Sequence, residues 1–132
     1  MYQKIIILGN LGSDVTMRYT QSGTPVASFS VATNRRWTGS DDEKKEQVTW
    51  YKVSVWNKLA ETCNQYLTKG RTVLVEGTME PDPDSGSPRI WTDNNGNPRA
   101  SYELRAQVVQ FLGGTRNDST SESGDTSSED MF

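Results

Sequence analysis

The run from Val48 to Trp56 alternates two kinds of side chain, and this period of two restricts it to a half-buried β-strand. One face of the strand carries Trp50, Lys52, Ser54 and Trp56, and the other carries Tyr51, Val53 and Val55. Burying Lys52 and Ser54 would leave polar groups without an obvious partner, so the tyrosine and valine face is predicted to face the core. The two tryptophans are therefore expected on the wetter face, unless both rings belong to a second packed layer.

Other short strands are predicted on both sides of this run. They are rich in β-branched and apolar residues and lie at residues 4–8, 26–33, 72–78, 89–93 and 99–112. The turn composition of residues 94–97 joins the last two as a hairpin. Residues 38–47 are polar with mixed charges and are expected to form an exposed hairpin loop, and residues 80–88 an acidic loop.

A single helix is predicted directly after the tryptophan strand. Asn57 is the predicted N-cap, and Gly70 stands where the helix is expected to end. Between them the apolar residues recur with helical spacing and form one face, made of Leu59, Ala60, Cys63, Tyr66 and Leu67. Cys63 is therefore expected to pack in the core.

The order of these elements predicts the fold class. Five or six short strands with one helix between the third and the fourth match an OB-fold, a five-stranded Greek-key barrel that binds oligonucleotides or oligosaccharides on one face. From Gly113 onward the chain is almost entirely Gly, Ser, Thr, Asn and acids, which is too poor in apolar residues to fold. We expect an all-β domain with one helix over residues 1–112 and a disordered acidic tail over residues 113–132.

Composition excludes several kinds of site. Cys63 is the only cysteine and histidine is absent, which excludes an intrachain disulfide and zinc sites built from several cysteines and histidines. The absence of histidine also removes the commonest general base, and we expect neither a cofactor nor a metal ion. No stretch approaches the about 20 apolar residues that span a bilayer, and the first residues lack the pattern of a signal peptide, so a cytoplasmic protein is expected.

The net charge of −3 is unevenly distributed. Residues 115–132 hold one arginine and five acids, so the rest of the chain carries a net charge of +1. Phosphate binding needs cations only where the phosphates lie, and the acidic total is therefore a weak argument against a nucleic-acid partner.

Each of the four tryptophans has a basic residue within three positions of it. Rings that stack on bases of any identity, next to cations that contact phosphates, are typical of proteins that bind single strands. The candidate DNA-binding residues are Trp37, Trp50, Trp56, Trp91, Arg35, Arg36, Lys52, Lys58 and Arg89. Lys69 and Arg71 rank second, because cations at the end of a helix also stabilise its dipole. Lys44 and Lys45 lie among acids and are expected to be only solvated.

The final four residues form an acidic and apolar tip. Glu129 and Asp130 precede Met131 and the terminal carboxylate of Phe132. A pocket with a basic rim could capture such a tip, so these four are the predicted partner-binding residues. The alternative is that the tail, like most acidic tails, is only solvating.

Seven short motifs run through the chain in a fixed order. They are Ile7-Leu8-Gly9-Asn10-Leu11-Gly12, Phe29-Ser30-Val31-Ala32-Thr33, the strand 50–56, Lys58-Leu59-Ala60-Glu61, Tyr66-Leu67-Thr68-Lys69-Gly70, Val75-Glu76-Gly77 and Trp91-Thr92-Asp93. None is specific alone, but their order and spacing together resemble the bacterial single-stranded DNA-binding protein family, across residues 1–112 and again at the final residues.

The resemblance implies an OB-fold that binds and protects single-stranded DNA with little sequence preference during replication, recombination and repair. It also implies a non-enzymatic protein located at the nucleoid, usually a homotetramer, although a homodimer stays open, with a C-terminal tip that docks replication, recombination and repair proteins. The stacking rings of the family fall on Trp37, Trp50, Trp56 and Trp91. Three features depart from the family. The ring at Trp56 is usually phenylalanine, the tail lacks the usual aspartates before Ile-Pro-Phe, and the acidic residues 80–88 replace a connection that is often shorter and more basic.

Two other classes of function stay open. A metal-dependent nuclease would need acids spaced as Asp82, Asp84 and Asp93 are, although acids in such turns usually only solvate. An OB-fold module for proteins or oligosaccharides would bind its ligand with little dependence on salt, unlike a phosphate binder.

Overall fold

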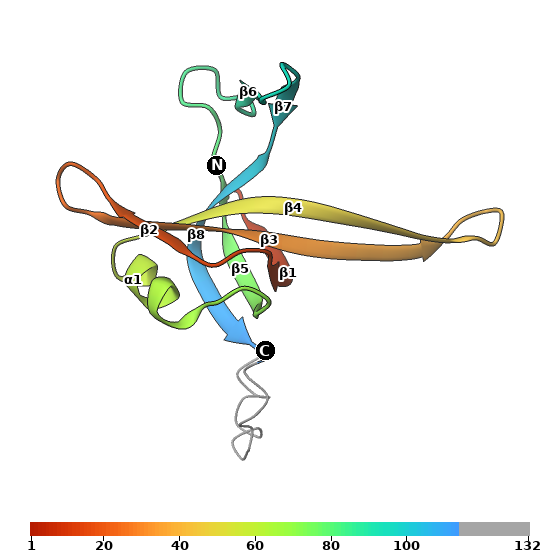
Figure 1. The fold of residues 1–132 in the computed structure, drawn as a ribbon, viewed down its shortest axis with the longest axis horizontal. Helices are drawn as coiled ribbons and strands as arrows, with labels where there is room; N and C mark the ends of the chain where they lie inside the picture. Colours follow the sequence, from red (N-terminus) through yellow and green to blue (C-terminus); the bar gives the residue numbers. More distant parts are fainter. Residues whose placement is uncertain (114–132) are drawn as a thin grey trace, which may run out of the picture.

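The computed structural model describes residues 1–113, in which strands curl into a closed barrel (Figure 1). The barrel consists of β1 (Ile5–Leu11), β3 (Pro25–Thr38), β4 (Lys44–Trp56), β5 (Thr72–Met79) and β8 (Tyr102–Leu112). The sheet order is β1-β5-β8-β4-β3-β2, and a further pairing between β1 and β3 closes the barrel. This confirms the predicted OB-fold, with five barrel strands and one helix.

The first half of β4 leaves the barrel together with the end of β3. β4 pairs with β8 in parallel only from Tyr51 to Ser54, whereas its antiparallel pairing with β3 runs from Trp56 back to Lys44. The two strands therefore form a long two-stranded ribbon that projects from the barrel (Figure 1). The predicted loop at residues 38–47 was wrong, since only residues 39–43 connect the strands. Both faces of the ribbon are solvated, and the sequence there lacks the apolar alternation that marks a half-buried strand.

The helix is shorter than predicted. α1 (Asn57–Tyr66) has Trp56 at its N-cap position with no side-chain cap, so the prediction of Asn57 as cap was wrong. Asn57 is instead the first helical residue and has a φ of 59°. The helix ends at Tyr66 and not at Gly70, because Leu67 takes an extended conformation that buries its side chain against the barrel.

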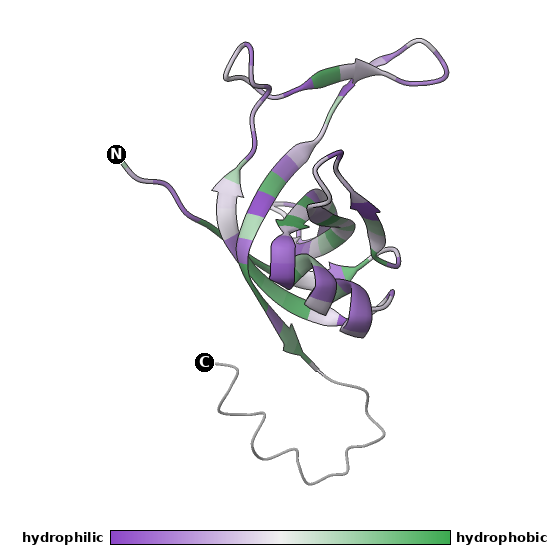
Figure 2. Ribbon diagram, turned by 90° about the vertical axis from the view of Figure 1, so that its left-hand side faces the viewer, coloured by the Kyte–Doolittle hydropathy of each residue, from purple (hydrophilic) through white to green (hydrophobic). Residues whose placement is uncertain are grey.

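The core lies inside the barrel and beneath α1. Val53 and Val55 are fully buried, which confirms the predicted core face of the tryptophan strand, and Cys63 is buried with them. Burial raises the pKa of the Cys63 thiol to about 11. Figure 2 shows long hydrophobic stretches along the barrel strands and a mostly hydrophilic α1, whose buried side consists of small residues.

Two further elements differ from the sequence prediction. β2 (Thr16–Tyr19), an edge strand beside β3, was not predicted, and the helix therefore follows the fourth strand and not the third. β6 (Ile90–Thr92) and β7 (Pro98–Ala100) form a separate hairpin, here called the arm, that projects from the barrel (Figure 1). The strand predicted at residues 99–112 is thus interrupted at Ser101. Within residues 1–113, no helix is long and apolar enough to cross a membrane.

Candidate nucleic-acid interface

The outer face of β4 presents the predicted row of side chains. Trp50 is 53% exposed and Lys52 is exposed, whereas Ser54 and Trp56 are half-buried. The β3 residues that pair with this row are small: Ala32 lies opposite Trp50, Ser30 opposite Lys52 and Ser28 opposite Ser54. Because these neighbours are small, the Trp50 ring and the Lys52 ammonium project beyond them, and a flat ligand can approach both.

Trp50 is held in place by a glycine of the neighbouring strand end. A Cβ atom added to Gly12 would overlap the six-membered ring of Trp50, which shows that the ring lies directly on the Gly12 backbone. The Gly12 amide donates a 2.9 Å hydrogen bond to the Ser30 carbonyl and so fixes this support to β3. The far edge of the Trp50 ring therefore abuts the protein backbone, which restricts where the ring can lie.

The Trp56 ring is less accessible to a stacking base than its position in the sequence predicts. The guanidinium carbon of Arg105 lies 4.7 Å from the centre of its ring, an attractive cation–π contact that covers one ring face. The indole nitrogen is buried and has no hydrogen-bond partner among residues 1–113. Arg105 was not predicted as a site residue, because its place over Trp56 depends on the parallel register of β8 with β4.

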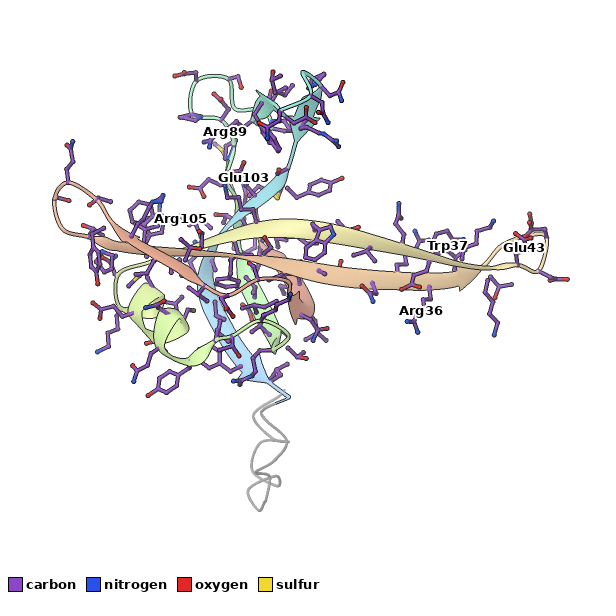
Figure 3. All side chains as sticks on the ribbon, viewed as in Figure 1. Arg36, Trp37, Glu43, Arg89, Glu103 and Arg105 are labelled. Carbon is purple, nitrogen blue, oxygen red and sulfur yellow. The ribbon has the colours of Figure 1, made fainter. Side chains whose placement is uncertain are left out.

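A polar hollow of about 220 Å³ lies beside Trp56. It is lined by Lys52 and Arg89, two of the candidate DNA-binding residues, and also by Arg18, Glu80 and Glu103, which were not candidates. Figure 3 labels Arg89 and Glu103 at the base of the arm, where their charged atoms lie 3.8 Å apart. Glu80 accepts a 3.0 Å hydrogen bond from the Ser54 hydroxyl. The hollow thus combines three cations with two carboxylates, so its charge is mixed.

A second hollow, here called the edge hollow, lies where β4 loses its pairing with β8. It measures about 480 Å³ and is bounded by Trp50 and Lys52 on one side and by Ser101 and Tyr102 on the other. Tyr102 is 57% exposed and was not predicted as a site residue. Its strand position alone gives no signal, because only the register Tyr51↔Tyr102 brings it to this edge of β4, on the face that carries Tyr51.

The structure does not bring Trp37 to the tryptophan row. Trp37 lies on the projecting ribbon, where it pairs with Lys45, and strand alternation puts it on the ribbon face opposite to that of Trp50. The guanidinium carbon of Arg35 lies 4.5 Å from the centre of the Trp37 ring, and Arg36 lies 3.6 Å from the carboxylate of Glu46. Figure 3 shows Arg36 and Trp37 well away from Arg89, Glu103 and Arg105.

Trp91 stands on the arm, paired with Arg99 of β7. It is exposed, but the arm forms a sheet separate from the barrel. The arm turn is held by Asp93, whose carboxylate accepts a 2.8 Å hydrogen bond from Arg99 and backbone hydrogen bonds from Asn95 and Asn97. The bond from Arg99, with those from the backbone, lowers the pKa of Asp93 below its ordinary value.

The acids of the nuclease alternative stabilise turns. Asp82 accepts backbone hydrogen bonds from Asp84 and Ser85, as Asp93 does in the arm. In the described part of the chain, no three side chains of histidine, cysteine or acids are grouped as a metal site. The carboxylates of Asp82 and Asp93 therefore have a structural role in turns.

The remaining candidates lie outside the two hollows. Lys58 is exposed on the first turn of α1, and Lys69 is exposed in the turn before β5. Arg71 donates a 3.3 Å hydrogen bond to the Tyr66 carbonyl at the end of α1, which is the structural role that the sequence left open for it. Glu129, Asp130, Met131 and Phe132, with the rest of the predicted disordered tail from residue 114 on, lie outside the described residues.

The chain is similar to known proteins in sequence and in fold. The model of the Single-strand binding protein family matches residues 2–112. The Single-stranded DNA-binding protein of Wolinella succinogenes is 37% identical over 112 residues, which cover 85% of this chain but only 65% of that protein. Single-stranded DNA-binding protein 1 of Xylella fastidiosa is 40% identical over 111 residues, covering 83% of this chain and 76% of its own.

Two solved structures share the fold. The Plasmodium falciparum SSB complex with ssDNA superposes with a TM-score of 0.69 at 28% identity and covers 85% of this chain and 96% of that one. The small single-stranded DNA-binding protein from Streptomyces coelicolor has a TM-score of 0.67 at 20% identity, and the match covers 83% of this chain and 93% of that one.

Proposed function

The chain belongs to the single-strand binding protein family, and from this premise we propose that it binds single-stranded DNA with little sequence preference. The observation that carries the proposal is the exposed Trp50 ring, which rests on Gly12 and has Lys52 two residues away on the same face. A ring can stack on any base, and a neighbouring cation can contact the phosphate that follows it. The similar Plasmodium structure, whose title names a complex with ssDNA, supports this assignment.

The proposed biological role follows from this activity. The protein coats and protects single strands during replication, recombination and repair, at the nucleoid in the cytoplasm, and catalyses no reaction. Residues 1–112 are the binding domain, and residues 113–132 carry the tip, Glu129 to Phe132, that recruits partner proteins. A tip that combines negative charge with apolar side chains suits a pocket with a basic rim.

We also propose that copies of the chain associate through an apolar patch on the outer faces of β1, β5 and β8. Ile6, Leu8 and Val108 are exposed there, and Leu8 pairs with Leu74 of the next strand. Adjacent exposed apolar side chains of this kind commonly mark protein–protein contacts. A homotetramer is the proposed assembly, with a homodimer as the alternative, and light scattering of the free protein distinguishes them.

A fluorescence titration tests the main proposal. Oligothymidine should quench the emission of Trp50, and replacing both Trp50 and Trp56 by alanine should weaken binding by about 2–6 kcal/mol, at about 1–3 kcal/mol per stacked ring. The Lys52→Ala variant should reduce the slope of log affinity against log salt by about one unit. Absence of quenching at low salt would refute the proposal, and affinity independent of salt would favour a module for uncharged ligands. Magnesium-dependent cleavage of a labelled strand would instead indicate a nuclease.

A further inference from the structure

Tyr102 presents an aromatic surface, and it is not among the predicted site residues. Its ring lies 5.6 Å from that of Tyr51, with 34° between the planes, and Tyr51 packs against the core. Tyr102 is therefore supported from the barrel side while 57% of it stays exposed. A ring that is held on one side and open on the other is what base stacking requires.

The edge hollow in front of Tyr102 has the size and the chemistry for a base. Its volume of about 480 Å³ falls in the range of small-molecule sites, about 300–1,000 Å³. Polar side chains of Ser30, Gln47 and Thr49 line it between the rings of Trp50 and Tyr102. Hydroxyl and amide groups can donate to or accept from the edge of any base.

The hollow is continuous with the proposed binding face. Trp50 and Lys52 line it from the outer face of β4. Tyr102 pairs with Tyr51, whose side chain lies on the other face, so a strand stacked on Trp50 passes the free edge of β4 to reach the Tyr102 ring. On its other side, Tyr102 also borders a more apolar hollow beneath the arm, lined by Met79, Pro81 and Pro88. The arm carries Trp91, so Tyr102 lies between the two regions in which the tryptophans stand.

From this placement we propose that Tyr102 stacks on a base held in the edge hollow, next to the nucleotide bound at Trp50. The inference rests on the proposed function and adds a ring that the family-based set of four tryptophans lacks. The edge hollow would accept any nucleobase, because the contact with Tyr102 is made through the π face of the base.

The test measures, by fluorescence anisotropy, the affinity of three tyrosine variants for a fluorescein-labelled oligothymidine of about 16 nucleotides. The Tyr102→Ala variant should bind about 5- to 100-fold more weakly, and Tyr102→Phe should stay within about twofold of the original protein, because it keeps the ring. Tyr19→Ala is the matched control, since Tyr19 is 62% exposed on the edge strand β2 and lines neither hollow. Its affinity should not change.

A photocrosslink gives a second result that does not depend on how well a variant folds. With 5-iodouracil in the oligonucleotide and the unaltered protein, mass spectrometry should find a crosslink on the peptide that contains Tyr102. If the protein binds DNA but shows no such crosslink and Tyr102→Ala binds normally, the inference is wrong while the proposed function stands. If the unaltered protein binds no oligonucleotide, the proposed function itself is wrong. If Tyr102→Ala changes the assembly mass but not DNA affinity, the hollow is an interface between copies, and the inference is overturned.

Discussion

At the scale of single residues, the contact between Gly12 and Trp50 gives a test of the proposed stacking on Trp50. The Gly12→Ala variant should push the Trp50 ring out of position, because the new Cβ atom and the ring would occupy the same space. Gly12 has no positive φ, so alanine strains nothing but this contact. We expect DNA affinity to fall by up to about 1–3 kcal/mol, the worth of one stacked base, measured by titration of an oligonucleotide.

A double-mutant cycle identifies the cause of that loss. If Gly12→Ala acts through the ring, it should cost no further affinity in a Trp50→Ala background. Equal costs in both backgrounds would show that Gly12 affects binding by another route. Thermal unfolding of each variant separates a loss of binding from a loss of folding.

Glu80 places a carboxylate in a hollow that also holds cations. Glu80→Gln keeps an acceptor for the Ser54 hydroxyl but removes the negative charge, so phosphates should be repelled less. We expect affinity to rise by about two- to fivefold at low salt and the gain to shrink at high salt. Glu61→Gln is the matched control, since Glu61 is exposed on α1 and does not line the hollow. An equal gain from both variants would mean that only net charge matters.

The buried thiol of Cys63 predicts how stability depends on pH. Its pKa in the folded protein is about 11, above the ordinary value of 9.0, so the thiol favours the folded state below pH 9. As the pH rises from 9 through 11, the unfolded chain loses this proton first, and up to about 3 kcal/mol of stability should be lost. Denaturant melts at several pH values measure this loss, and Cys63→Ala should lose less stability over the same interval.

At the scale of elements, the ribbon of β3 and β4 separates two of the predicted stacking rings. Trp37 and Trp50 lie on opposite ribbon faces and share no contact partner in this register, so their effects on binding should be independent. We expect the losses of affinity in Trp37→Ala and Trp50→Ala to add in the double variant to within about 0.5 kcal/mol. A strongly non-additive double variant in anisotropy titrations would indicate that both rings contact the same stretch of the strand.

The elements also show which parts of the fold a sequence can predict. The alternation at residues 50–56 predicted a face correctly, because burial of Val53 and Val55 leaves a local pattern in the chain. The ribbon and β2 bury little, so they leave no such pattern and were missed. The sequence missed neighbours of the candidate site for a different reason. Glu103 and Arg105 reach the tryptophan row, and Tyr102 the edge beside it, only through the pairing of β8 with β4. That pairing joins segments about 50 residues apart, with no local signal for its register.

At the scale of the whole molecule, two surfaces have different chemistry. The outer face of β4 combines rings with charges and lies between the ribbon and the arm, which both project from the barrel (Figure 1). The outer faces of β1, β5 and β8 instead expose aliphatic side chains. The Lys4 ammonium lies 3.2 Å from the Glu76 carboxylate, and Glu76 pairs with both Ile6 and Val108 of the patch. Their hydrogen bond raises the pKa of Lys4. A charged face for DNA and an apolar patch for a second copy can therefore be occupied at the same time.

Leu8→Glu tests this division of surfaces. Leu8 is 54% exposed in the apolar patch, and a carboxylate there would have to be desolvated on association, so the assembly mass from light scattering should fall. Thr16→Glu adds the same charge to the exposed edge strand β2 and should leave the mass unchanged. If Leu8→Glu kept the mass of the original assembly, the patch would not be the interface, and a monomeric original protein would refute association altogether.

Because Leu8 lies away from the tryptophan row, a short oligonucleotide that fits one barrel should bind Leu8→Glu with its original affinity. A longer strand should lose affinity, since it can then no longer engage several linked copies.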